Sequence, residues 1–259
     1  MHAARVAASL LRRLTGSLVY RKRLPQEFGG TRIYVTSRAD IRLLVPGFSA
    51  SAADLLRVAS AYVRPGDCVW DIGANLGIFA FCASWKAGAE GIVFSLDADP
   101  YYISLQHKSA RGLSRGYARV TPLCAAVADK MAVLELAIPQ RGAARSHLAT
   151  VQGNDTGETE CTKQVVSVTA DFLLDYWRRP DFVKVDIEGA ELLFLAGAAR
   201  LVQEVRPAFY IEVNERNSDR ATAIFRAHRY KLFAAPDGRH FVEQDRCRFN
   251  TLAQPAEKC

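Results

Sequence analysis

The sequence of 259 residues lacks several features that mark specialised classes of protein. It has no apolar run near the roughly 18–20 residues of a membrane-spanning helix, no internal repeat and no low-complexity tract. Its cysteines lie far apart without a Cys-x-x-Cys pair, which excludes a disulfide framework and a paired-thiolate zinc site. We therefore expect a reducing, cytoplasmic location, with Cys68, Cys82 and Cys124 packed as small hydrophobes.

Acidic residues are missing from the start of the chain, where the first is Glu27. Residues 1–24 combine Lys and Arg with apolar residues at helical spacing, which predicts an amphipathic helix, and their apolar runs are too short for a secretory signal. We expect this helix to pack against the domain or to fray, and an anionic membrane surface is its alternative partner. Elsewhere the basic residues are scattered among Asp and Glu. The net charge of +7 is therefore interpreted as an ordinary solvated surface, and a nucleic-acid partner is disfavoured.

The length, with 49% hydrophobic and 24% charged residues, indicates one globular α/β domain with an extension. We place a helical and hairpin lead-in at residues 1–62, the main domain at 63–250 and a C-terminal tail at 251–259. Residues 31–45 alternate between apolar and polar side chains, which predicts a β-hairpin. Ser51 is expected to cap the helix that follows.

From residue 67 onward, short apolar segments alternate with amphipathic ones. This pattern predicts an α/β fold with a mostly parallel central sheet, helices on both faces and a terminal antiparallel hairpin at 230–242. The expected parallel strands are 68–72, 91–96, 120–127, 182–186 and 207–213, with further short strands at 133–138 and 165–168. Residues 140–157 are rich in Gly, Ser, Thr and Asn, and are expected to form a mobile lid-like loop or a solvated connection.

The first strand leads into the turn Asp71-x-Gly73-x-Asn75-x-Gly77. This spacing differs from the dinucleotide fingerprint, because Ala74 and Asn75 crowd the place where the backbone would approach a pyrophosphate. An adenosyl ligand that carries an amino acid and a sulfonium suits this turn better. Its carboxylate would meet backbone amides near Gly73 and Ala74, and Asp71 would lie opposite its positive charge.

Acids at the ends of three strands support the same interpretation. Asp71, Asp97 and Asp186 each close a strand, and the carboxyl ends of parallel strands share one edge of a sheet. Asp97 can accept hydrogen bonds from both hydroxyls of a ribose, while Asp71 and Asp186 would favour the ligand's ammonium and sulfonium groups. A single acid of this kind is explained equally well as a helix N-cap, but three in register are not.

Several segments resemble the FkbM family of S-adenosylmethionine (SAM)-dependent methyltransferases. The most specific is Val183-Lys-Val-Asp-Ile-Glu-Gly-Ala-Glu191, followed by Leu195-Ala-Gly-Ala198. The others are the Asp71 turn, Asp97-Ala98-Asp99-Pro100, Ala126-Val127-Ala128-Asp129, and Arg206-Pro207 through Glu212. The chain departs from the family at Asp97-Ala98-Asp99-Pro100, where members commonly carry Glu-Pro-Asn-Pro, and at Ser146-His147-Leu148, which replaces a Ser-Ser-Leu-like element.

This resemblance implies a Rossmann-like class I methyltransferase fold, SAM as cofactor and O-methylation of a hydroxyl on a small-molecule, sugar or lipid-linked acceptor. The cofactor-binding residues that it implies are Asp71, Gly73, Ala74, Asn75, Gly77, Asp97, Ala98, Ala126 and Asp186.

An alcohol must lose its proton as it is methylated, so a base within hydrogen-bond reach is expected. The candidate catalytic residues are Asp186, Glu188, Glu191, Glu212 and His147. Glu188 and Glu191 are explained equally well as first-turn acids that complement a helix dipole, and His147 as a solvated loop residue. Clustered acids can also hold a divalent ion, but no set of metal ligands is assigned.

Three other functions stay open at this point. A nucleic-acid methyltransferase is disfavoured, because the sequence has no Asn/Asp-Pro-Pro-aromatic tetrapeptide and no Pro-Cys nucleophile. A nicotinamide oxidoreductase is disfavoured by Asn75 in the turn and by the absence of a Tyr-x-x-x-Lys motif. A non-catalytic SAM-binding protein would share the same binding residues and differ only in turnover.

Overall fold

The computed structural model describes residues 18–44, 47–139, 147–148, 159–234 and 242–258. The predicted N-terminal helix lies outside these ranges except at its end, where the prediction is wrong. Val19–Arg23 is a strand, β1, and it pairs antiparallel with β2, Arg32–Thr36.

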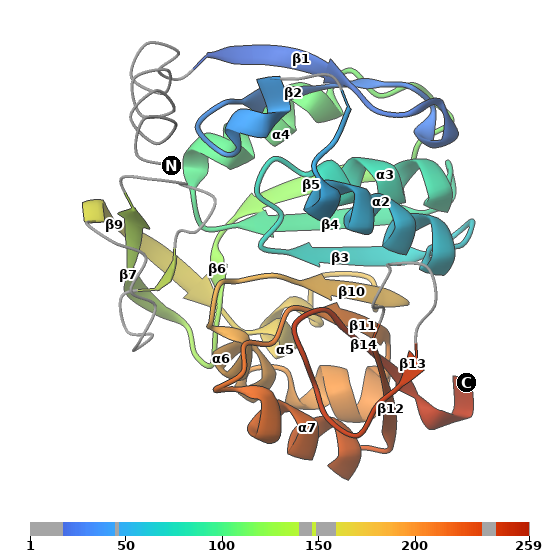
Figure 1. Cartoon of the computed structure of the whole chain (residues 1–259), viewed down its shortest axis with the longest axis vertical. Helices are drawn as coiled ribbons and strands as arrows, with labels where there is room; N and C mark the ends of the chain where they lie inside the picture. The colour runs from blue at the N-terminus through green and yellow to red at the C-terminus, as the bar shows by residue number, and fades with distance from the viewer. Residues whose placement is uncertain (1–17, 45–46, 140–146, 149–158, 235–241, 259) are drawn as a thin grey trace, which may run out of the picture.

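An eight-stranded sheet forms the centre of the molecule (Figure 1). Its parallel strands are β3, Cys68–Ile72; β4, Ile92–Asp97; β5, Arg119–Cys124; β10, Phe182–Val185; and β11, Ala208–Ile211. The other strands are β12, Tyr230–Ala234; β13, Val242–Glu243; and β14, Thr251–Pro255. β14 is antiparallel to β11 and β12, and β13 is antiparallel to β12, so β12 runs in the same direction as the parallel strands. The order across the sheet is β13-β12-β14-β11-β10-β3-β4-β5. The predicted parallel sheet and closing antiparallel hairpin are confirmed.

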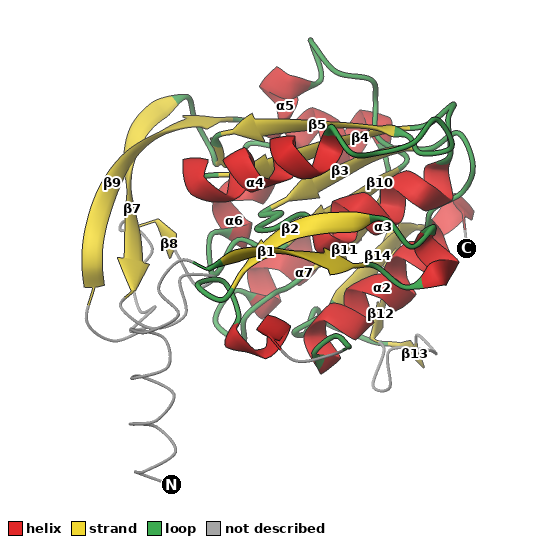
Figure 2. Ribbon diagram, turned by 90° about the horizontal axis from the view of Figure 1, so that it is seen from above, coloured by secondary structure: helices red, strands yellow, loops and turns green. Residues whose placement is uncertain are grey.

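Helices cover both faces of this sheet, because successive strand residues point to opposite sides and both sides are apolar (Figure 2). The face that includes Val69 is covered by α2, Ala50–Tyr62; α3, Ile78–Ala87; and α4, Pro100–Ala110. The face that includes Trp70 is covered by α5, Ala170–Leu173; α6, Glu191–Ala196; and α7, Ser218–Ala227. The predicted α/β class is confirmed.

A second sheet begins where β5 ends. Its order is β6-β9-β7-β8, with bounds β6, Ala126–Val127; β7, Ala132–Pro139; β8, His147–Leu148; and β9, Thr159–Val168. Figures 1 and 2 both show β7 and β9 side by side at one flank of the molecule. Because β6 follows β5 after a single residue, this sheet starts at the carboxyl edge of the central sheet. The strand expected at 120–127 is therefore two strands in two sheets.

The prediction of a hairpin within residues 31–45 is wrong. Ile41–Leu44 is a 3-10 helix, and β2 pairs with β1 instead. The cap of α2 is Ser49, whose side chain accepts a hydrogen bond from the amide of Ala52, and not Ser51.

The tail expected at 251–259 is also a wrong assignment, because β14 lies inside the sheet. It pairs with β11 on one side and with β12 on the other, and Leu252 and Ala253 are buried. The described cysteines are free thiols, but Cys124 is exposed at the end of β5 rather than packed. The loop predicted at 140–157 lies outside the described residues except for β8. Within the described ranges, no helix combines the length and the apolar character needed to cross a membrane.

Candidate functional site

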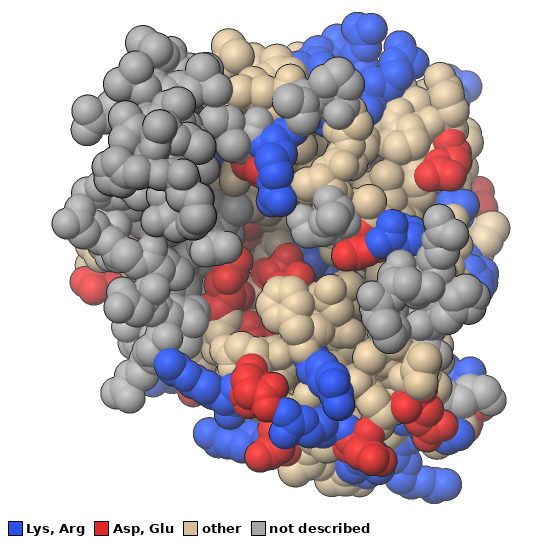
Figure 3. Space-filling view, viewed as in Figure 1, with Lys and Arg blue, Asp and Glu red and all other residues tan. Residues whose placement is uncertain are grey.

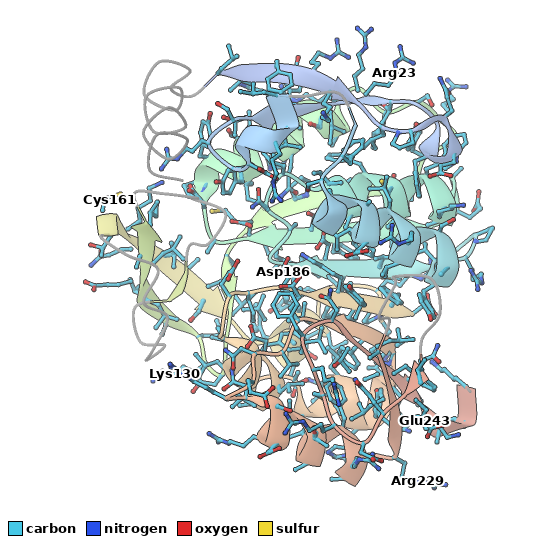
Figure 4. All side chains as sticks on the ribbon, in the orientation of Figure 1. Arg23, Lys130, Cys161, Asp186, Arg229 and Glu243 are labelled. Carbon is cyan, nitrogen blue, oxygen red and sulfur yellow. The ribbon has the colours of Figure 1, made fainter. Side chains whose placement is uncertain are left out.

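Four neighbouring parallel strands end at one edge of the central sheet, and each has an acid at or beside its end. The strands are β4, β3, β10 and β11, and the acids are Asp97, Asp71, Asp186 and Glu212. Figure 3 shows a recess in this face with acidic side chains on its floor, at the place where Figure 4 labels Asp186. The structure thus brings the three predicted acids to one edge and adds Glu212 to them.

Lys184 joins two of these acids, although the sequence alone suggested no role for it. Its side chain is 3% exposed, and its Nζ lies 3.3 Å from Oδ1 of Asp71 and 3.3 Å from Oδ2 of Asp186. Nζ also donates a 2.8 Å hydrogen bond to the carbonyl of Gly73. Burial by itself would lower the pKa of Lys184, but the charges of Asp186 and Asp71 outweigh it and hold that pKa above its ordinary value. A lysine inside a buried strand is the sequence signal that would have found this cation.

Asp71 serves the interior of the protein rather than the open edge. It is completely buried, and it lies opposite Lys184 in the pairing of β3 with β10. Burial raises the pKa of Asp71, and the ammonium of Lys184 opposes that rise. The cation beside Asp71 in the structure is Lys184, and the role of Asp71 opposite the ligand's positive charge stays a prediction.

The turn after β3 needs glycine for a close approach to β10. Gly73 has a φ of +74°, and a Cβ at this position would overlap the carbonyl oxygen of Asp186. The amides of Gly73 and Ala74 donate to the carbonyl of Leu96 at 2.9 and 2.8 Å. Both amides are therefore engaged within the fold, and the prediction that they receive the ligand's carboxylate is wrong. Gly77, with a φ of +76°, begins α3.

Asn75, in the same turn, is fixed by contacts from β4 and α4. Its amide donates a 2.7 Å hydrogen bond to Oδ2 of Asp97, and its carbonyl accepts one of 2.7 Å from Nε2 of Gln106. Gln106 is fully buried and accepts a hydrogen bond from the hydroxyl of Ser95 at 2.6 Å. Oδ1 of Asn75 is buried and has no hydrogen-bond partner among the described residues. A bound ligand can satisfy such an orphaned acceptor.

Asp97 is held so that both of its oxygens keep a free acceptor position. Oδ2 accepts the amide of Asn75, and Oδ1 accepts the amide of Asp99 at 2.8 Å. Each carboxylate oxygen has a second lone pair, so the two hydroxyls of a ribose can both donate to Asp97. Burial raises the pKa of Asp97 to about 6, although the two amides oppose that rise.

The second sheet reaches this corner of the site through Lys163. Its Nζ lies 3.0 Å from Oδ1 of Asp99, which is almost fully buried and also caps α4 through the amide of Tyr101. Ala98 is half-buried next to this pair, and Ala126 is buried in β6. The corner between β4 and β6 is thus closed by a contact between the two sheets.

The other candidate bases are Glu191, Glu188 and His147. Glu191 is buried, accepts the amide of Gly189 at 2.6 Å and the side-chain amide of Asn217 at 3.0 Å, and so holds the turn before α6. Its burial and its place in the first turn of α6 agree with the alternative interpretation of Glu191 as a structural acid. Glu188 is in that turn with a φ of +47° and is half-buried. His147 is in β8 opposite Ala137, and its side chain lies outside the described structure.

Asp186 and Glu212 form a carboxyl pair at the open edge. The side chain of Asp186 is 26% exposed, and Glu212 shares a hydrogen bond with it. Burial raises the pKa of Glu212 well above its usual range, and the charge of Asp186 adds to that rise. Glu212 therefore holds a proton at neutral pH. Among the described residues no cluster of His, Cys, Asp and Glu has the arrangement of a metal site, and the ammonium of Lys184 lies between Asp71 and Asp186.

The sheet order places antiparallel β14 between β11 and β12, and Asp97 at the end of β4 keeps free acceptor positions. These features, with the family match, define a class I SAM-dependent methyltransferase. Within that class the chain belongs to the methyltransferase FkbM domain family, whose sequence model matches residues 71–240. The cofactor is accordingly SAM. The two acceptor positions of Asp97 and the orphaned oxygen of Asn75 fit this nucleoside.

One curated relative and two solved structures show the range of similarity. The hexuronic acid methyltransferase AglP of Haloferax volcanii is 25% identical over 154 residues, which cover 59% of this chain and 58% of that protein. The match thus spans little more than half of that relative's length. A structure of methyltransferase FkbM from Methylobacillus flagellatus has a TM-score of 0.48 and 14% identity, and the match covers 96% of this chain and 58% of that one. A structure of precorrin-6y C5,15-methyltransferase from Geobacter metallireducens has a TM-score of 0.47 and 15% identity, and the match covers 82% of this chain and 91% of that one.

The affinity for SAM is expected to fall as the pH drops through about 6. The folded protein holds the pKa of Asp97 near 6, so the free carboxyl becomes protonated below that pH and loses acceptor capacity for the ribose. Binding must then release a proton, which weakens the affinity by up to about tenfold per pH unit. Titration calorimetry between neutral and mildly acidic pH measures this dependence. Asp97→Asn should bind weakly at every pH, and an unchanged affinity in folded Asp97→Asn would remove Asp97 from the ribose site.

Proposed function

We propose that this protein transfers the methyl group of SAM to a hydroxyl oxygen of a small, sugar-like acceptor. The identity of 25% to a hexuronic acid methyltransferase supports a sugar. When bound, SAM supplies an electrophilic methyl group on a sulfonium. The acceptor oxygen forms a bond to the methyl carbon while the carbon–sulfur bond breaks and its electron pair stays on sulfur. The hydroxyl proton needs a base close to that oxygen.

The carboxyl pair of Asp186 and Glu212 is the observation that carries this proposal. Asp186 is partly exposed, lies 3.3 Å from Nζ of Lys184, and follows β10, two strands from Asp97 in the sheet order. A hydroxyl seated against Asp186 can donate its proton to that carboxylate. Glu212 keeps the pair at one negative charge by holding a proton, and the ammonium of Lys184, beside Asp186, compensates that charge. Asp186 is therefore the proposed base, and Glu212 positions it.

The remaining residues hold the cofactor in line with this base. Asp97 receives the ribose, Asn75 presents a buried acceptor, and Lys184 ties the turn at Gly73 to Asp186. One cation thus links the cofactor turn to the proposed base, so their separation is set by the fold. Fixed geometry of this kind supplies much of the acceleration in a displacement at carbon.

The proposal is tested by incubating the protein with SAM that carries a deuterated methyl group. Hexuronic acids, neutral hexoses and a simple phenol serve as acceptors, with mass spectrometry as readout. We expect the deuterated methyl group on a sugar, and resistance of the product to mild alkali, because an O-methyl ether survives conditions that hydrolyse a methyl ester. Asp97→Ala is the matched control for cofactor dependence. SAM binding without transfer to any hydroxylated acceptor would identify a non-catalytic binding protein, and transfer to RNA would identify a nucleic-acid methyltransferase.

A further inference from the structure

One flank of the fold combines several basic residues with very few acids, although basic residues occur along the whole chain. Residues 18–39 and 100–128 are distant in sequence but pack together, and the amide of Tyr34 donates a 2.8 Å hydrogen bond to the hydroxyl of Ser109. These two segments contain nine Lys or Arg and a single acid, Glu27. The formal charge of these two segments, +8, exceeds the formal charge of +7 of the whole chain. The other segments together are therefore close to neutral.

Seven cations of this flank are exposed and make no ion pair with an acid in the described part of the chain. They are Arg21, Arg23, Arg32, Lys108, Arg111, Arg115 and Arg119, which we call the basic face. Some surface cations elsewhere are compensated by an acid. Arg200 pairs with Asp175, and Arg246 pairs with Glu215. The basic face thus differs from the rest of the surface in its shortage of neighbouring acids.

The ribbon of β1 and β2 presents three of these cations on one side. Exposure alternates along β1, so Arg21 and Arg23 share a face with Val19, while Ile33 on β2 is buried in the core. Arg23 lies directly opposite Arg32 in the ladder, and like charges in that position repel each other. Figure 4 shows Arg23 at the outer surface, and Figure 3 shows Lys and Arg gathered at the same end of the molecule. An anionic partner would relieve this repulsion.

We propose that the basic face docks the protein on an anionic phospholipid membrane, an inference that goes beyond methyl transfer and does not depend on it. Leu18 is 50% exposed and Val19 is 37% exposed beside these arginines. A lipid interface binds cations at its phosphate groups and apolar side chains just below them, whereas a nucleic-acid backbone interacts favourably with the cations alone. The combination therefore favours lipid.

The test is flotation of the full chain with vesicles of phosphatidylcholine, and with vesicles that also contain phosphatidylglycerol. We expect binding to the mixed vesicles only. The triple variant Arg21→Gln/Arg23→Gln/Arg32→Gln should lower the partition coefficient by about a hundredfold. The matched control Arg200→Gln/Arg226→Gln/Arg246→Gln removes the same charge from other surfaces and should bind like the wild type. SAM affinity, measured for both variants, shows that each one is folded.

Three results would overturn the proposal. The first is equal binding to both kinds of vesicle, and the second is an equal loss in the two triple variants, which would show that net charge alone is responsible. The third is full binding by the Arg21/Arg23/Arg32 variant that disappears when residues 1–17 are deleted. Retention on RNA at a salt concentration that releases the mixed vesicles would instead identify nucleic acid as the partner.

Discussion

Replacing Lys184 by Met is expected to lower the free energy of unfolding by about 3–5 kcal/mol and to abolish measurable SAM binding. The substitution keeps most of the side-chain volume but removes the only cation that the structure shows within ion-pair distance of Asp71. Asp71 is completely buried, so its charge would be left uncompensated. The carbonyl of Gly73 would lose its hydrogen bond at the same time, and the cofactor turn would come free from the end of β10. Urea unfolding and calorimetry measure the two effects.

A double variant separates the lost charge balance from lost packing. Asp71→Leu/Lys184→Met removes both ends of the buried pair, and we expect it to recover much of the stability while SAM binding stays weak. Lys231→Met is the matched control, because Lys231 is 45% exposed and lies 4.0 Å from an exposed Glu243. That change should cost less than about 1 kcal/mol. A similar loss of unfolding free energy in Lys184→Met and Lys231→Met would show that the buried ion pair stabilises the protein no more than an exposed one.

The positions of the site residues along the chain were predictable because they depend on local signals. Apolar runs that end in an acid mark strands, and glycines at fixed spacing mark the turn that follows. These signals located the strands that carry Asp71, Asp97 and Asp186, and the structure places all three at one edge. The directions of their side chains were not predictable, because direction depends on which strand lies opposite and in what register.

Asp71 and Asp97 show this difference. Both follow an apolar run, but Asp71 is the penultimate residue of its strand and pairs in register with Lys184, which turns it into the core. Asp97 is the last residue of its strand and meets two amides at the edge. The amides of Gly73 were assigned to a ligand because the sequence does not show that the Leu96 carbonyl lies within reach. Apart from the contact of Asp97 with the amide of Asp99, these contacts join segments that are far apart in sequence.

The basic face and β14 were missed for the same reason. Lys and Arg alternate with acids along much of the chain, and packing of α4 against β2 brings two acid-poor segments together. The strand at Thr251–Pro255 follows no clear periodicity, and it is defined by the two antiparallel neighbours that enclose it. Composition is a property of the chain, whereas a charged surface is a property of the fold.

Asp186→Asn is expected to reduce turnover by about 100-fold to 10,000-fold while SAM affinity changes little. The amide keeps the shape of the side chain but cannot take up the proton of the acceptor hydroxyl. Glu212→Gln should have a smaller effect at neutral pH, because Glu212 is already neutral there and an amide can still donate to Asp186. The rate constants kcat and kcat/KM, measured with the acceptor found in the deuterated-methyl assay, report these effects.

The pH profiles of the same variants distinguish a base from a structural acid. Burial and the charge of Asp186 raise the pKa of Glu212, so in the wild type Glu212 loses its proton between neutral and alkaline pH. The pair then holds two negative charges, and the rate should fall as the pH rises. Glu212→Gln stays neutral and should lack this alkaline fall, whereas exposed Glu215→Gln, three residues further along, should keep it. An Asp186→Asn enzyme with wild-type turnover, or an alkaline fall that persists in Glu212→Gln, would show that this carboxyl pair does not handle the proton.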